Sequence, residues 1–163
     1  MFRRGLAVAA WALVIAASAA AHGPDHAMSG GKPGDAAKVT RTIEIVASDN
    51  AFSLKALQVR DGETVRFVVR NDGLDPHELL IGTAAAHAEH RRMMKAMIEQ
   101  QKKGSGHAHD MSTMEAHKNG VTVEPGKTAS FIWTFARTAN LEFACDIPGH
   151  YEDGMHGPIT FAR

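Results

Sequence analysis

The chain has 163 residues, of which 44% are hydrophobic and 22% charged, as in one globular domain rather than a disordered or membrane-spanning protein. Its 18 basic residues balance its 18 acidic ones, so the chain lacks the excess of positive charge that nucleic-acid phosphates require, and we expect no nucleic-acid partner. The unusual part of the composition is ten His, eight Met and a single Cys. Such side chains bind soft transition metals.

The first 21 residues have the organisation of a secretory signal peptide. Arg3 and Arg4 precede an apolar run over residues 6–17, and a stretch of small residues ends at Ala21. The apolar run is too short to be a spanning helix, which needs roughly 20 residues. We therefore expect cleavage after Ala21, export to the periplasm and no membrane span in the mature chain.

Residues 22–38 are rich in Gly, Pro, Asp and Ala and show no apolar period, which predicts a flexible leader. Cleavage after Ala21 would place His22 at the mature N-terminus. There its α-amine and imidazole could chelate copper, with His26 assisting. A solvated polar leader is the simpler interpretation.

From Val39 onward, short β-branched and apolar stretches are separated by turn signals, which is typical of a sandwich or barrel. Asp61-Gly62 and Pro125-Gly126 supply turns. The sequence thus predicts an all-β domain over residues 39–163. Its strands are expected at residues 40–46, 54–60, 64–71, 77–81, 121–124, 128–135, 141–144 and 158–162.

The pattern changes over residues 83–119, which we interpret as an insertion into the β domain. Thr83 can cap a helix, and residues 84–103 are rich in Ala, Met, Glu, Gln and Lys. Gly104-Ser105-Gly106 ends this helix, and a loop bearing His and Met follows up to Asn119. The candidate accessory copper ligands of the insertion are His87, His90, Met93, Met94, Met97, His107, His109, Met111, Met114 and His117.

Two interpretations of these accessory residues stay open. A Met stripe at helical spacing also suits core packing, whereas His107 to His117 are flanked by Gly, Ser, Asp and Lys. Thioether and imidazole groups in a flexible segment would favour Cu(I) with exchangeable occupancy, as suits buffering or transfer. We expect the insertion to act separately from the main site, so that replacing residues 82–120 by a short connection leaves that site intact.

One loop near the C-terminus carries a thiolate, an imidazole and a thioether at five-residue steps: Cys145, His150 and Met155. A blue-copper site needs two imidazoles and one thiolate with a weak axial Met, so one imidazole must come from elsewhere. His77, at the start of a predicted strand, is the natural supplier. Each residue alone also suits a core Cys, a surface His or a core Met. Their joint spacing favours a copper site, in which Cys145 is held as the thiolate.

The order and spacing of these residues resemble the cupredoxin family over about residues 39–161. Within it, the chain resembles the periplasmic CopI-like copper-tolerance cupredoxins. They share the His-Glu at His77, the Met- and His-bearing insertion, and the Pro-Gly-His-Tyr-Glu run at residues 148–152. The resemblance implies a cupredoxin-like Greek-key β-sandwich or barrel with an inserted helix. It also carries over four copper ligands, His77, Cys145, His150 and Met155.

The resemblance implies a copper-binding protein that acts in copper tolerance or buffering, with redox cycling of the central ion. Its expected partners are copper ions and periplasmic copper-handling or redox proteins. The alternative is a soluble electron carrier that docks to redox enzymes through the exposed edge of His150. In many electron-transfer cupredoxins an Asn follows the first His and ties the ligand loops together, whereas Glu78 stands there in this chain.

An enzymatic role is not expected. Multicopper oxidases and nitrite reductases distribute paired His-x-His motifs over several cupredoxin domains. This chain has one domain and one such pair, His107-Ala-His109.

Overall fold

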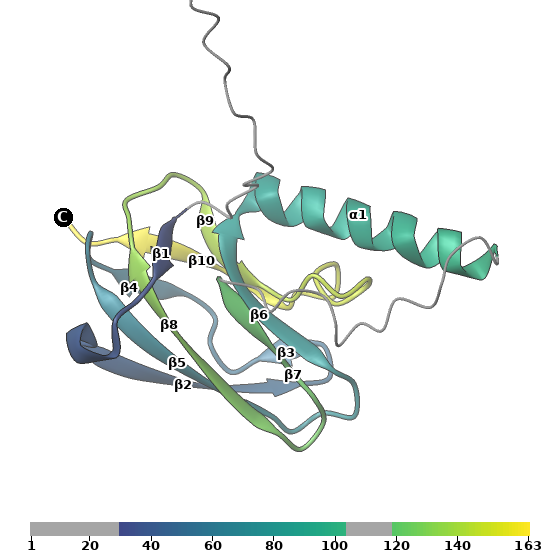
Figure 1. Ribbon diagram of the computed structural model, residues 1–163, viewed down its shortest axis with the longest axis horizontal. Coiled ribbons are helices and arrows are strands. Elements are labelled where there is room, and N and C mark those ends of the chain that lie inside the picture. The colour runs from purple at the N-terminus through teal and green to yellow at the C-terminus, as the bar shows by residue number, and fades with distance from the viewer. Residues whose placement is uncertain (1–29, 104–118) are drawn as a thin grey trace, which may run out of the picture.

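The computed structural model describes residues 30–103 and 119–163, which form two packed five-stranded sheets with helix α1 (Ala84–Lys102) outside them (Figure 1). The first sheet has the strand order β1 (Gly31–Pro33), β8 (Thr128–Phe135), β5 (Thr64–Asn71), β2 (Arg41–Ser48) and β3 (Ala51–Phe52). The second has the order β4 (Leu57–Val59), β10 (His156–Phe161), β9 (Leu141–Ala144), β6 (His77–Thr83) and β7 (Gly120–Val123). The predicted β-sandwich with an inserted helix is confirmed.

The chain crosses repeatedly between the two sheets, so strands far apart in sequence become neighbours. β2 and β5 pair in parallel, as do β4 and β10, and the other pairs are antiparallel. Apolar side chains from both sheets, such as Phe67 and Phe143, share one buried cluster. That cluster also includes Cys145 and Met155, so two proposed ligands belong to the core that holds the sheets together.

Three strands lie where the sequence predicts them. β5, β8 and β9 have the predicted bounds. The two predicted turns are also present, with Gly62 at φ 75° and Gly126 at φ 70°. This left-handed backbone is accessible to Gly without the steric cost that a side chain would add.

Part of the segment 22–38, for which the sequence predicts a flexible leader, forms regular secondary structure. β1 pairs antiparallel with β8, and a short 3-10 helix, η1 (Ala36–Lys38), connects β1 to β2. The indole Nε1 of Trp133 donates a hydrogen bond to the Gly30 carbonyl over 3.2 Å. A Gly- and Pro-containing edge strand of three residues has no apolar period of its own, and its pairing depends on β8. The predicted signal peptide and residues 22–29 lie outside the described residues.

Helix α1 starts as predicted. The Oγ1 of Thr83 accepts a hydrogen bond from the Ala86 N–H over 3.2 Å, which satisfies one of the free N–H groups of the first turn. The helix ends at Lys102, next to the predicted Gly-Ser-Gly stop. Within residues 30–103 and 119–163, no helix combines the length and apolar character needed to cross a bilayer.

Candidate metal centre

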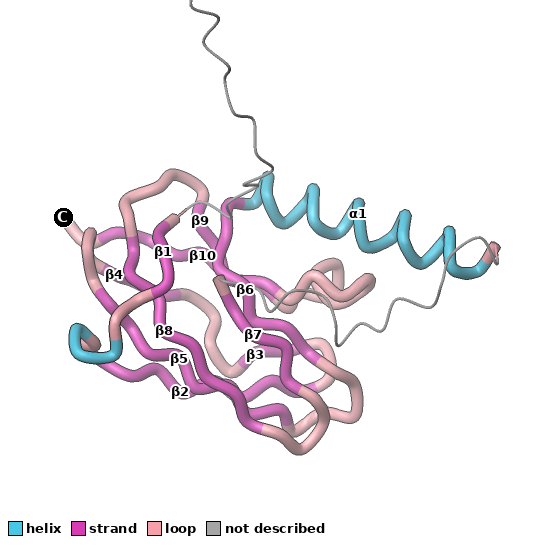
Figure 2. The backbone as a smooth tube through the Cα atoms, viewed as in Figure 1, coloured by secondary structure: helices cyan, strands magenta, loops and turns pink. Residues whose placement is uncertain are grey.

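Strand pairing brings the predicted ligands to one end of the second sheet. β6 begins at His77, and Cys145 directly follows β9. These strands run antiparallel with Leu80 opposite Ala144, so the start of β6 meets the end of β9. His150 lies in the loop between β9 and β10, drawn in pink beside α1 in Figure 2. Two sequence-distant segments therefore meet at this loop.

The ligand atoms of His77, Cys145 and His150 all lie within 4.8 Å of one another. The Nδ1 atoms of His77 and His150 are 3.2 Å apart. The Sγ of Cys145 is 3.4 Å from the Nδ1 of His150. In the part of the chain that the structure describes, no other group of three His, Cys, Asp or Glu side chains converges in this way.

The loop from Cys145 to Met155 is closed by its own backbone. The Cys145 N–H donates to the Met155 carbonyl over 2.9 Å, and the Met155 N–H donates to the His150 carbonyl over 3.0 Å. Gly149 and Gly154 have φ values of 99° and 102°, which turn the chain tightly. The Met155 side chain is fully buried in the same apolar cluster as Cys145.

The Cys145 thiol is fully buried as part of the apolar core cluster. Burial raises its pKa to about 12, opposed by backbone N–H groups of Glu78 and Ile147. The Glu78 N–H donates to Sγ over 3.3 Å. Burial favours the neutral thiol, whereas a coordinating metal cation deprotonates a thiol outright. Metal binding at Cys145 would therefore release a proton.

The two imidazoles differ in exposure. His77 is 1% exposed, and burial lowers its pKa, which favours the neutral ring that binds metals. Its Nε2 is 3.7 Å from the Asp49 carboxylate, which in turn accepts the Leu74 N–H over 2.8 Å. His150 is half-buried, so its ring is the part of the cluster that reaches the protein surface.

Asn71 shapes the turn before His77, a role that sequence reasoning missed. Its Nδ2 donates to the carbonyls of Asp75 and Val123 over 2.8 and 2.9 Å, and its Oδ1 accepts the Gly73 N–H over 2.8 Å. Asn71 is fully buried at the end of β5. The only sequence signal was an Asn followed by Asp72-Gly73, which marks a turn but not a support for a ligand.

The donor set fits copper. Bonds from first-row metals to imidazole nitrogen and thiolate sulfur are about 2.0–2.3 Å long, so ligands of one ion lie roughly 3 to 4 Å apart. The two distances that involve the His150 Nδ1, 3.2 and 3.4 Å, are in this range. Two imidazoles and one thiolate are the equatorial set of blue-copper sites. His77, Cys145 and His150 would hold the ion.

The helical accessory candidates are divided between the buried and exposed faces of α1. His87 and Met94 are buried, His90 and Met97 are half-buried, and Met93 is 44% exposed. The Nδ1 of His87 is engaged by the Asp146 carboxylate at 2.7 Å. The remaining candidates lie outside the described residues: His107, His109, Met111, Met114 and His117.

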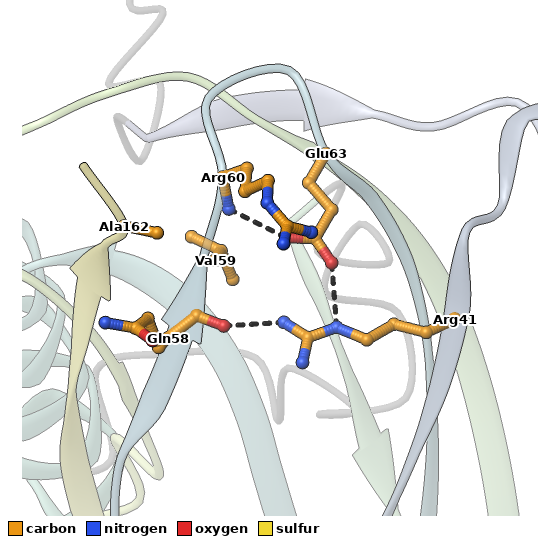
Figure 3. Close-up of a pocket in the computed structure, with 6 residues that line it drawn as sticks. All are labelled: Arg41, Gln58, Val59, Arg60, Glu63 and Ala162. Atoms are coloured by element: carbon orange, nitrogen blue, oxygen red, sulfur yellow. Dashed lines mark hydrogen bonds and ion pairs between the residues drawn. The ribbon is translucent and has the colours of Figure 1, made fainter.

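A small polar pocket lies at the opposite end of the sandwich (Figure 3). It is bounded by the end of β4 and by Ala162 after β10, whereas the metal cluster borders the start of β10. Within it, Arg41 contacts Glu63 over 2.8 Å and the Gln58 carbonyl over 2.6 Å. Arg41 and Glu63 thus form an ion pair in this pocket, which is not part of the metal centre.

A family model described as copper binding proteins of the plastocyanin/azurin family matches residues 39–162. The match spans both sheets and all three clustered donors, so the chain belongs to this family and copper is its cofactor.

Relatives named copper-resistant cuproprotein CopI refine this placement. The Pseudomonas aeruginosa protein is 41% identical over 166 residues, which cover 90% of each chain. The Rubrivivax gelatinosus protein is 39% identical over 145 residues, which cover 88% of this chain and 80% of the relative. The Vibrio cholerae protein is 37% identical over 128 residues, which cover 77% of this chain and 68% of the relative. Within the family, the chain is a CopI-like cupredoxin.

Solved structures agree with this fold. Auracyanin B matches 82% of this chain and 96% of its own length, with a TM-score of 0.60 and 18% identity. Auracyanin A from Chloroflexus aurantiacus matches 74% of this chain and 98% of its own length, with a TM-score of 0.51 and 21% identity. At such identities the likeness concerns the fold alone, and it confirms the cupredoxin-like sandwich.

Proposed function

We propose that this cupredoxin holds one copper ion in a type 1-like centre, with His77, Cys145 and His150 as equatorial ligands and Met155 as a weak axial ligand. The observation that carries this proposal is the convergence of three donor atoms within 4.8 Å at the end of a buried core. When bound in such a donor set, copper supplies one-electron chemistry between Cu(I) and Cu(II).

The protein's own contribution is to keep the ligands in place. Cys145 and Met155 are anchored in the core, and the loop between them is closed by backbone hydrogen bonds. The Glu78 N–H points at Sγ and stabilises negative charge there. A ligand set held in this way needs little movement when the charge of the ion changes, which makes redox cycling possible without unfolding the loop.

The physiological role that we propose is copper tolerance through binding and buffering of copper in the periplasm, without catalysis. The CopI relatives are named for copper resistance, and the N-terminal 21 residues have the pattern of a secretory signal peptide. Copper-handling or redox proteins of the same compartment are the proposed protein partners.

An accessory role in copper binding belongs to the same proposal. Among the accessory candidates on α1, those that are not fully buried are His90, Met93 and Met97. Imidazole and thioether groups at helical spacings of three and four lie on adjacent turns, which suits an exchangeable Cu(I) ion. The His and Met residues of segment 104–118 would add further ligands of the same kind.

Electron transfer is the second candidate function. Half-buried His150 gives the copper cluster an edge at the surface. Leu74, in the turn that precedes His77, is 84% exposed and offers an apolar contact for a partner. A carrier would need this edge but not the accessory residues of the insertion.

Growth of copper-sensitive cells separates these roles. We expect the wild-type gene to restore growth on copper and Cys145→Ser to restore it less, because the thiolate ligand is lost. Removing His and Met from segment 104–118 should also reduce growth on copper while leaving the central site intact. If neither variant affects growth on copper, the tolerance role is wrong and electron transfer becomes the better interpretation.

A further inference from the structure

Helix α1 contacts the ligand loop through three side chains spaced one turn apart. His87 and Arg91 both reach the Asp146 carboxylate, at 2.7 and 3.2 Å, and Lys95 reaches Glu152 at 3.3 Å. Residues at i, i+4 and i+8 lie along one helix face. Figure 1 shows this helix lying along the loop between β9 and β10.

The contact between His87 and Asp146 is fully buried. His87 and Asp146 are both 0% exposed. An ionised carboxylate only accepts hydrogen bonds, so the Nδ1 of His87 donates to it, and the Arg91 guanidinium donates to its second oxygen. A buried carboxylate is costly unless it is paired. Asp146 therefore depends on α1 for both of its partners in the described part of the chain.

These contacts fall on the residues next to two proposed ligands. Asp146 follows Cys145, and Tyr151 follows His150. The Arg91 guanidinium lies 3.5 Å from the centre of the Tyr151 ring. The other stacking partner of Tyr151 is His156, at 4.1 Å between ring centres. The helix thus holds the ligand loop immediately after Cys145 and immediately after the half-buried His150.

We propose that His87 and Arg91 are positioning residues of the copper centre, which fix the ligand loop through Asp146 and Tyr151 and thereby set the spectrum and reduction potential of the bound ion. This inference rests on the ligand assignment proposed above. Groups behind metal ligands orient those ligands, and their loss typically lowers metal affinity by about 10- to 100-fold. The contacts also argue against the expectation that residues 82–120 are removable without effect on the main site.

The experiment uses neighbouring residues of α1 as matched variants. His87→Leu removes the donor to Asp146, and His87→Asn retains an N–H near the position of Nδ1. Arg91→Ala removes the contacts with Asp146 and Tyr151. Arg92→Ala is the control, because Arg92 is exposed and pairs with Glu89 on the same helix.

Two readouts are needed. In the metal-free protein, amide hydrogen exchange of residues 145–155 should become at least about tenfold faster in His87→Leu and Arg91→Ala. In the copper-loaded protein, the same variants should shift the Cu(II)–thiolate band and the reduction potential. His87→Asn should restore both readouts toward wild type, and Arg92→Ala should change neither.

The proposal is overturned if Arg91→Ala leaves loop exchange unchanged, or if the exchange rises while the band and potential stay at wild-type values. Should His87→Leu fail to fold, the proposal is tested with the remaining variants, Arg91→Ala, His87→Asn and the control Arg92→Ala. Failure of the ligand assignment gives a different result, since wild type itself would then lack the Cu(II)–thiolate band. In that case a copper centre positioned by His87 is also excluded.

Discussion

The backbone N–H of Glu78 donates a hydrogen bond to the Sγ of Cys145 over 3.3 Å. This bond joins the strand that carries His77 to the sulfur of Cys145. It uses the backbone, so it does not require the Asn side chain that follows the first His in many electron-transfer cupredoxins. The segment that carries His77 and the loop that carries Cys145 are therefore connected although Glu78 stands in place of that Asn.

Cys145→Ser should abolish the strong visible absorption of the copper-loaded protein. Cys145 is the only Cys in the chain, and a Cu(II)–thiolate bond produces this absorption. Visible spectra at equal protein and copper concentrations provide the measurement. An unchanged colour in the variant would falsify the assignment of Cys145 as a ligand.

Met155→Leu should leave copper bound but change its spectrum and raise its reduction potential. Loss of a weak thioether donor leaves a less coordinated ion, which favours Cu(I). Replacement of His77 or His150 by Ala should instead weaken copper binding. Voltammetry and copper titrations distinguish the two effects. A loss of copper from Met155→Leu as complete as that from Cys145→Ser would contradict the weak axial role.

Asn71→Ala should lower the free energy of unfolding of the metal-free protein by about 2–3 kcal/mol, because buried backbone groups lose their hydrogen-bond partners. The neighbouring variant Asp72→Ala is the control. Asp72 is exposed and its side chain pairs with Arg70, so its removal should cost less than about 1 kcal/mol. Denaturant titrations provide both values, and equal effects would show that Asn71 does not organise this turn.

The metal-free protein should lose stability as pH rises from about 9 toward 12. Burial raises the pKa of Cys145 from 9.0 to about 12, so above pH 9 the unfolded chain releases this proton while the folded chain keeps it. Folding therefore becomes less favourable by at most about 1.4 kcal/mol per pH unit from this group. Below pH 9 the folded and the unfolded chain both keep this proton, so the stability from the neutral, buried Cys145 thiol is fully present.

Denaturant titrations between pH 8 and pH 10 measure this effect. Cys145→Ser should show a smaller decline, and so should the copper-loaded protein, whose thiol has already lost its proton. Tyr151, whose pKa is also raised to about 12 through burial and Glu142, contributes only above its ordinary value of 10.0. Equal slopes for wild type and Cys145→Ser below pH 10 would exclude a buried neutral thiol.

Replacing His90, Met93 and Met97 by Ala should reduce the number of Cu(I) ions bound per chain without changing the Cu(II)–thiolate band. The physical reason is that these side chains retain access to solvent and do not form part of the main cluster. Competition titrations with a Cu(I) chelator measure the stoichiometry. Exposed Glu99→Ala on the same helix is the control. If both variants bind the same number of ions, the helical residues hold no accessory ion.

The sequence was informative where chemistry and periodicity are local. The alternation in β5 and the spacing of Cys145, His150 and Met155 are visible within short windows, and His77 could be paired with them from strand order. β1 could not be found, because three residues with Gly and Pro pair only when β8 offers an edge.

The residues that hold the ligand segments in place were harder to predict than the ligands themselves. His87 and Asp146 are 59 residues apart in the sequence, and a His on a helix face looks the same whether it binds a metal or a carboxylate. Asn71 presents the same difficulty, since its pattern indicates a turn and its burial depends on the arrangement of β5 and β7. Such roles follow from tertiary packing, which a sequence pattern does not contain.

The two imidazoles of the proposed centre are 73 residues apart in the sequence and come together only when β6 and the C-terminal loop are both in place. Bringing such distant segments together requires the chain entropy of a long loop to be overcome first. Copper is thus expected to enter late, after the sandwich has closed, rather than to nucleate folding. A nascent chain that ends before β9 has no thiolate to offer, so premature termination yields a product without the central site.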